Sequence, residues 1–206
     1  MSRTAAVYGI LLAAGESRRM GFPKPLLRID GETYLERLVA AMRPAVDGLI
    51  IVLGAHREMI SRAIPRGPGI STVTNPNYPD GQLSSLKVAL RRIPENAAAV
   101  MVHLIDHPTV TSTTFSQMVE TWRNSPAPIL IARYRGRRGH PVIFERRLFD
   151  ELLAAPDNQG ARIVVNADPD RVTYCEVEDP GVSLDLDTPA DLIAAGLEPP
   201  PVSHAR

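Results

Sequence analysis

The residues with the clearest chemical potential lie between positions 12 and 27, where small, glycine and cationic residues follow a short apolar run. The run from Val7 to Leu12 is typical of a buried strand, and a glycine-bearing loop follows it. Backbone N–H groups in such a loop form a concavity that binds anions. Arg18, Arg19 and Lys24 can supply positive charge, and arginine can bind phosphate oxygens two at a time. The segment therefore predicts a site for a phosphate chain.

The loop differs from the two commonest phosphate-binding loops. A Walker loop requires Lys and then Ser or Thr directly after its second glycine, whereas Gly21 is followed by Phe22 and Pro23. A dinucleotide fingerprint requires glycine at its first, third and sixth positions, and Ser17 already breaks that pattern. The alternative without a function is a surface turn with a few solvated charges.

Residues 12–24 resemble the signature of nucleotidyltransferases that act on the molybdenum cofactor, Leu-Ala-Ala-Gly-x-Ser-x-Arg-Met-Gly-x-x-Lys. With Ala14, the signature is similar to that of the cytidylyl-transferring branch. The guanylyl-transferring branch usually has a second glycine at this position. The resemblance implies catalytic roles for Arg19 and Lys24, on the α-phosphoryl group and the departing pyrophosphate. It also implies that the nucleotide is held by the residues that precede them: Leu12, Ala13, Ala14, Gly15, Glu16, Ser17 and Arg18.

Three aspartates are the expected ligands of a divalent cation, which we take to be Mg²⁺. Asp106 follows the apolar run 100–105, so its carboxylate should lie at the carboxyl end of a strand, where α/β sheets bind ligands. Asp185 and Asp187 share one face if the backbone there is extended. Around Asp106 the family pattern is Gly-Asp-x-Pro, and Ile105 replaces its glycine in this chain. Around Asp185 and Asp187 the family pattern is Asp-x-Asp-Thr-Pro. The alternative is that Asp106 caps a turn before Pro108, and that Asp187 or Thr188 caps the helix near Pro189.

Two further segments match the same family. Residues 75–86 resemble its base-recognition loop, in which the start of a helix can read a base edge or bind an anion; the residues expected to contribute are Gly81, Ser84, Ser85 and Leu86. The alternative is an ordinary capped helix. His140, in the run Gly-His-Pro-Val, and Arg162 resemble the acceptor site. Asn158 stands where the family has Asp, so this chain lacks one charge in the region that the resemblance assigns to the acceptor.

The remaining pattern alternates strand-like and helical segments, which predicts an α/β fold. Strands are expected at residues 7–12, 50–53, 100–105, 129–132 and 140–144, the last as part of a hairpin, and helices at 34–42, 82–92, 113–123, 147–154 and 161–166. The family resemblance specifies a three-layer Rossmann-like nucleotidyltransferase fold (GT-A-like), a mostly parallel mixed sheet with helices on both faces. We expect a single domain over residues 1–197 and a disordered Pro-rich tail over 198–206.

Composition narrows the class of protein. The 206 residues contain 23 basic and 23 acidic side chains, so no strong overall field favours nucleic acid or a membrane surface as a partner. A single cysteine, Cys175, excludes an internal disulfide framework, and its alternating apolar surroundings favour a strand residue over a nucleophile. No apolar run reaches the ~20 residues of a membrane span. A soluble cytoplasmic protein is expected.

The sequence thus predicts an Mg²⁺-dependent enzyme that transfers CMP from CTP to a phosphate-bearing acceptor. The resemblance implies that this acceptor is the molybdenum cofactor and that a molybdoenzyme receives the product. Three alternatives remain open: transfer to a sugar or alditol phosphate, a glycosyltransferase that uses the Asp-x-Asp pair, and a non-catalytic chaperone of the cofactor. Scattered histidines and the lack of a Gly-x-Ser-x-Gly run argue against a zinc site and a serine hydrolase.

Overall fold

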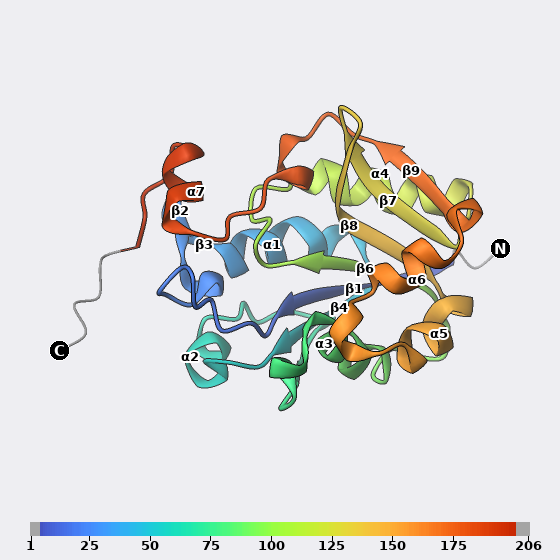
Figure 1. The fold of residues 1–206 in the computed structure, drawn as a ribbon, viewed down its shortest axis with the longest axis horizontal. Coiled ribbons are helices and arrows are strands. Elements are labelled where there is room, and N and C mark those ends of the chain that lie inside the picture. Colours follow the sequence, from blue (N-terminus) through green and yellow to red (C-terminus); the bar gives the residue numbers. More distant parts are fainter. Residues whose placement is uncertain (1–4, 201–206) are drawn as a thin grey trace.

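The structure, a computed structural model, describes residues 5–200 (Figure 1). Within these residues the main sheet has seven strands in the order β5-β4-β1-β6-β8-β7-β9. Their bounds are β1 Ala6–Ala13, β4 Gly48–Leu53, β5 Ile70–Thr74, β6 Ala97–Leu104, β7 Ile129–Tyr134, β8 Arg137–Glu145 and β9 Val172–Glu176. A separate two-stranded ladder pairs β2 (Arg28–Ile29) with β3 (Glu32–Thr33).

The main sheet is mostly parallel, as expected. β1 pairs in parallel with β4 and β6, β4 with β5, and β7 with β9. β8 runs antiparallel to both of its neighbours, β6 and β7. The β7–β8 hairpin predicted from residues 129–144 is therefore confirmed, and it places one reversed strand beside β6, where Ala99 to Val102 pair with β8.

Helices cover both faces of the sheet (Figure 1). One core contains Leu11 and Met101 from the sheet together with α1 (Tyr34–Met42) and α4 (Ser112–Asn124). The other contains Ile10 and Val102, their neighbours in sequence, together with α3 (Gln82–Leu90), α5 (Phe149–Ala154) and α6 (Arg162–Ala167). Because successive strand side chains point to opposite faces, a continuous apolar strand supplies both cores. The expected three-layer α/β arrangement is confirmed.

Local sequence signals explain where several helices begin. Thr33 caps α1, and its hydroxyl and the carboxylate of Glu36 satisfy each other's backbone N–H groups. Thr188 and Asp191 form the same arrangement at α7 (Pro189–Ala194), with proline at the first helical position. The cap that the sequence placed at Asp187 or Thr188 is thus Thr188, which leaves the Asp187 carboxylate available for other contacts.

The predicted elements are found within a few residues of their expected bounds. The helix expected at 82–92 ends at Leu90, and the one expected at 147–154 starts with a 3₁₀ turn, Arg146–Leu148. Cys175 is a buried residue of β9. Three elements were not predicted: β5, the β2–β3 ladder and α2 (Arg57–Arg62). Each is short or largely exposed, so its apolar periodicity is weak.

The tail expected over residues 198–206 falls partly outside the described residues. Positions 198–200 have neither helix nor strand, and 201–206 are not described. Among the helices of residues 5–200, none combines the length and apolar character that crossing a bilayer requires.

Candidate active site

The glycine-bearing loop after β1 is held in shape by its own polar groups. Ser17 adopts a left-handed backbone with φ of 55°, and its carbonyl accepts hydrogen bonds from the N–H groups of Met20 and Gly21. Its hydroxyl accepts a hydrogen bond of 3.0 Å from the backbone N–H of Lys24. Met20 is buried and anchors the loop in the core. The serine that the family signature requires therefore fixes the path between the loop and Lys24.

The two cations predicted to be catalytic converge on one carboxylate. Lys24, which is 7% exposed, and Arg19 both form ion pairs with Asp187. The Lys24 ammonium also lies 4.0 Å from the Asp106 carboxylate. Arg18 instead pairs with Glu16 at the exposed outer side of the loop. Residues that are about 160 positions apart in sequence thus form one charged cluster.

The three predicted metal ligands are brought together by the chain that follows β9. Carboxylate oxygens of Asp106, Asp185 and Asp187 lie within 4.8 Å of one another. The backbone N–H of Leu186 donates a 2.9 Å hydrogen bond to the Asp106 carbonyl, and the Leu186 side chain is fully buried. This anchoring turns the aspartates on either side of Leu186 toward Asp106.

A second anchor lies upstream on the same segment. Asp179 is buried, and its carboxylate accepts hydrogen bonds from the backbone and hydroxyl of Thr111, from the hydroxyl of Thr114 and from the N–H of Gly181. These contacts tie residues 179–186 to the N-terminus of α4, where the helix dipole favours a negative charge.

Electrostatics of the carboxylate cluster fit a divalent cation. Burial and the nearby charges of Asp106 and Asp187 raise the pKa of Asp185. Burial also pushes the pKa of Asp187 upward, but the hydrogen bonds and positive charges of Lys24 and Arg19 outweigh it and hold that pKa below its usual range. Asp106 Oδ1 is buried and has no hydrogen-bond partner among the described residues. Hard oxygen ligands of this kind suit Mg²⁺ or Mn²⁺, which would relieve the repulsion between the carboxylates.

The cluster borders two adjoining hollows. The smaller, of about 290 Å³, is lined by the signature loop, by the start of α3 and by the end of β6. Asp106, Asp187 and the cations Arg19 and Lys24 line it. The other lining residues are the predicted nucleotide-binding residues Leu12, Ala14, Gly15, Ser17, Arg18, Gly81 and Ser85, and also Tyr78, Gln82, Leu104 and Ile105. Ala13 lies in the core on the opposite face, and Glu16 lines neither this hollow nor its neighbour.

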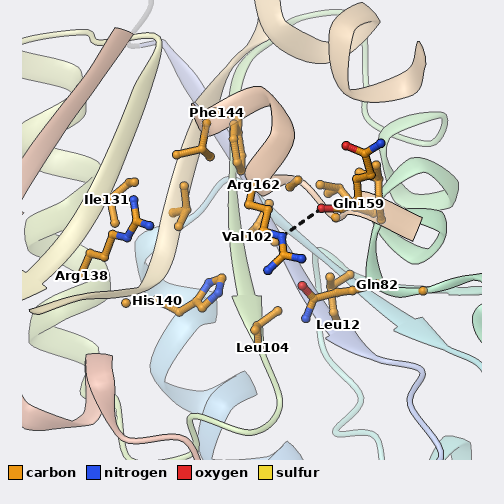
Figure 2. A pocket seen from close by; sticks show the side chains of 18 of the residues that line it. Leu12, Gln82, Val102, Leu104, Ile131, Arg138, His140, Phe144, Gln159 and Arg162 are labelled. Carbon is orange, nitrogen blue, oxygen red and sulfur yellow. Dashed lines mark hydrogen bonds between the residues drawn. The ribbon is translucent and has the colours of Figure 1, made fainter. Parts of the chain in front are cut away.

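The larger hollow, of about 550 Å³, has an apolar floor and a polar rim (Figure 2). Leu12, Gly81, Gln82 and Leu104 line both hollows, so the two are continuous. The floor comes from the sheet and includes Val102, Ile131, Val142 and Phe144. Polar groups at the rim include Gln82, Asn158, Gln159 and Asn166, and the cations are Arg138 and Arg162. Asp185 also lines this hollow.

Three of the predicted base-recognition residues line a hollow, and the fourth holds the loop in shape. Gly81, with φ of 116°, and Ser85 line the smaller hollow, whereas Leu86 lines the larger one. Ser84 lines neither: its hydroxyl donates to the carbonyls of Asn77 and Gly81 and accepts from the buried amide of Asn75. Ser84 therefore shapes the loop instead of facing a ligand.

His140 lies in the wall of the larger hollow (Figure 2). It belongs to a group of three histidines with His103 and His107. Its ring centroid lies 5.4 Å from that of His107 and 6.3 Å from that of His103. Burial, together with the charge on His107, lowers the pKa of His140 to about 4. Its Nδ1 is buried without a hydrogen-bond partner in the described part of the chain. A neutral imidazole with a free ring nitrogen can bind an uncharged polar group of a ligand.

Arg162, the other predicted acceptor residue, lies at the start of α6 on another side of the hollow (Figure 2). Its Nε donates a 3.3 Å hydrogen bond to the Gln159 carbonyl. The loop before it is fixed to α3, because Lys87 is buried and bonds the Ala155 carbonyl at 2.6 Å and the Asp157 carboxylate at 2.8 Å.

Several lining residues were missed by the sequence reasoning. Gln82 and Tyr78 belong to the predicted base-recognition segment but carry no signal of their own. Arg138 belongs to the basic run that precedes His140, and it lines the larger hollow together with Gly139 and His140. Its closeness in sequence to His140 is the signal that could have found it.

Known proteins resemble this chain in sequence and in structure. The "Bifunctional IPC transferase and DIPP synthase" of Rubrobacter xylanophilus is 39% identical over 115 residues, which make up 52% of this chain and only 26% of that protein. The molybdenum cofactor cytidylyltransferase of Escherichia coli K12 is 27% identical over 192 residues, 93% of this chain and 96% of that one. The crystal structure of Rv0371c from Mycobacterium tuberculosis H37Rv has a TM-score of 0.80 at 30% identity and covers 94% of this chain and 98% of its own.

A second structure of Rv0371c, in complex with manganese, has a TM-score of 0.75 and covers 92% of this chain and 97% of its own. The MobA-like NTP transferase domain matches residues 9–172, which include the signature loop, Asp106, the β7–β8 hairpin and both predicted acceptor residues. The chain belongs to the MobA-like NTP transferase family.

Proposed function

We propose that this protein transfers CMP from CTP to the phosphate group of an acceptor, with release of pyrophosphate, and that the acceptor is the molybdenum cofactor. The observation that carries the proposal is the position of the carboxylate cluster: Asp106 and Asp187 line one hollow, and Asp185 lines the other. Two substrates placed in the two hollows would meet there. We also propose that residues 1–197 act as one domain that carries both hollows.

The smaller hollow suits the triphosphate of a nucleotide. It combines the backbone of the signature loop with the cations Arg19 and Lys24. Both cations pair with Asp187, and a triphosphate bound in this hollow would share their charge with that carboxylate. Preorganised cations aimed at a developing charge are a large source of catalysis in phosphoryl transfer. The preference for CTP rests on Ala14 in the signature.

The larger hollow suits an acceptor with a flat, weakly polar body. Its floor is formed by aliphatic and aromatic side chains, which would leave the hydroxyl groups of a sugar or alditol without partners. The amides of Gln82, Asn158 and Gln159 at the rim can each donate and accept, as the edge of a nitrogen heterocycle requires. The molybdenum cofactor has such a pterin body and carries a phosphate. A sugar or alditol phosphate is the second candidate acceptor, because the polar rim and its two arginines could also bind such a molecule.

The reaction needs little covalent chemistry from the protein. An oxygen of the acceptor phosphate attacks the α-phosphorus of CTP, a new P–O bond forms, and the bond to the oxygen that bridges to the β-phosphorus breaks. Pyrophosphate leaves with that electron pair. The attacking phosphate oxygen is already anionic, so no strong general base is required, and positioning and charge stabilisation dominate. A cation held by Asp106 and Asp185 would act as a Lewis acid on the phosphate oxygens.

The test is to measure pyrophosphate release with CTP, GTP, ATP or UTP, with Mg²⁺ or Mn²⁺, and with either molybdopterin or an alditol phosphate as acceptor. We expect release with CTP, a divalent cation and molybdopterin together. Asp106→Asn should abolish it, whereas Asp170→Asn, the same change at an exposed turn, should leave it unchanged. Release with GTP alone would change the nucleotide, and release with the alditol phosphate alone would change the acceptor. Stable cofactor binding without release from any nucleotide would favour the chaperone.

A further inference from the structure

We propose that Arg138 binds an anionic group of the acceptor, from a wall of the larger hollow other than the one that carries Arg162. This inference rests on the proposed function in that it takes the larger hollow as the acceptor site. Arg138 comes from β8 and Arg162 from α6, and both line the hollow (Figure 2).

The first half of β8 runs along the hollow, where Arg138, Gly139 and His140 line it in succession. A register shift between Ile131 and Arg133 interrupts the β7–β8 ladder beside these residues. Val142 and Phe144, which share one face of β8, continue the lining along the floor. The strand thus runs from an apolar floor, past a neutral imidazole, to a cation at the rim. An acceptor that lies along β8 would place its uncharged body over Val142 and Phe144 and its charged group near Arg138.

Comparison with Arg133, its partner across the β7–β8 ladder, shows that Arg138 is not used to neutralise an acidic side chain of the fold. Arg138 is directly opposite Arg133 in the β7–β8 ladder. Arg133 forms an ion pair with Glu176, and its guanidinium lies 4.4 Å from the centroid of the Tyr174 ring. Within residues 5–200, by contrast, Arg138 has no carboxylate within 4.0 Å and no side-chain hydrogen bond. Like charges directly opposite each other destabilise a sheet, so Arg138 costs the fold stability.

The acids of the larger hollow do not balance Arg138 either. The carboxylate of Asp157 pairs with Lys87, and that of Asp185 belongs to the cluster with Asp106 and Asp187. Two arginines therefore remain available to a ligand, Arg138 and Arg162. A guanidinium can bind phosphate oxygens in a bidentate manner, so the ligand chemistry they fit is a phosphate ester on a largely apolar body.

The experiment compares paired ligands and paired variants. The probes are 6-hydroxymethylpterin and its phosphate monoester, and glycerol and glycerol phosphate, titrated by calorimetry into the full-length protein without nucleotide. Arg138→Gln is compared with Arg137→Gln, which removes the same charge from the adjacent exposed residue that does not line the hollow. We expect Arg138→Gln to weaken binding of a phosphate ester by on the order of tenfold to a hundredfold. Binding of the matching alcohol should change by less than about twofold, as should every affinity of Arg137→Gln.

The melting temperature of Arg138→Gln provides a second readout. Since the substitution removes a repulsion across the ladder, the variant should melt at the same temperature as the wild type or slightly higher. A merely structural arginine would instead lower the melting temperature and weaken the binding of ester and alcohol alike, which would overturn the inference.

The two proposals fail in different ways. If the wild type binds glycerol phosphate and not the pterin phosphate, the proposed acceptor is wrong. The role of Arg138 is then tested by comparing how Arg138→Gln changes the affinities for glycerol phosphate and for glycerol. If the wild type binds both phosphate esters no more tightly than their alcohols, the hollow contains no anion site and the inference about Arg138 is wrong. The inference is equally wrong if Arg137→Gln weakens binding of the ester as much as Arg138→Gln does.

Discussion

Replacing His140 with asparagine should make the stability of the protein less sensitive to mild acid. His140 is enclosed by His103, His107 and the backbone of β6, and burial keeps it neutral with a pKa of about 4. In the unfolded chain its pKa returns to the ordinary value of 6.5. As the pH falls below that value, the unfolded state takes up a proton that the native state does not, so the free energy of unfolding must fall.

The size of the effect follows from the two pKa values. Between about pH 7.5 and about pH 5.5 the unfolded histidine becomes largely protonated, whereas the native one stays neutral. Linkage then gives a loss on the order of 1 kcal/mol from this residue alone. The loss continues to grow until the pH reaches the native pKa and is constant below it. His103, whose pKa is also lowered by burial, contributes in the same direction to both proteins.

The assay is urea unfolding of the wild type and His140→Asn at both pH values. The variant will have its own offset in stability, so the quantity compared is the change between the two pH values. We expect the wild type to lose on the order of 1 kcal/mol more than the variant. Equal losses would refute the reasoning. If the variant does not fold, NMR titration of the His140 ring in the wild type decides, because a ring that titrates near 6.5 contradicts its burial as a neutral group.

Three further substitutions test separate parts of the structure. Lys24→Met removes a preorganised cation and should lower the turnover number by about two to three orders of magnitude, with little change in circular dichroism; an unchanged turnover would remove Lys24 from the site. Gly139→Ala would place a Cβ 1.7 Å from the Val182 carbonyl, so unfolding should become easier by about 3 kcal/mol, and the melting temperature should drop by roughly 6–12 °C. An unshifted melting temperature would show that the turn at Val182 yields freely. Lys87→Met breaks the ion pair with Asp157 and should raise the KM for the acceptor more than the KM for the nucleotide; equal increases would mean that the loop does not shape the acceptor hollow.

The fold could be predicted largely because its signals are local and repeated. Apolar runs such as Ile50–Leu53 and capping residues such as Thr33 determine buried strands and helix starts within a few residues. The strands that were missed are short, and β5 is mostly exposed at the edge of the sheet, so it lacks the continuous apolar run of a central strand.

Site residues could be predicted from the sequence only where they belong to a recognisable motif. The convergence of Lys24 and Arg19 on Asp187 depends on contacts between segments about 160 residues apart, and only the family resemblance links those segments in the sequence. The structural role of Ser84 was not foreseeable, because a hydroxyl at a helix start can face a ligand or its own loop equally well. Arg138 was lost among several neighbouring arginines, and the register shift in the β7–β8 ladder beside it cannot be read from the sequence.

The central claim is that nucleotide and acceptor meet at the carboxylate cluster between the two hollows. The most direct measurement is a crystal structure with Mn²⁺ and a non-hydrolysable CTP analogue, with the cation located by anomalous scattering. We expect Mn²⁺ bound by Asp106 and Asp185, the triphosphate along the signature loop beside Lys24, and the larger hollow free for the acceptor. A cation bound away from these aspartates, or a nucleotide whose base fills the larger hollow, would contradict this claim.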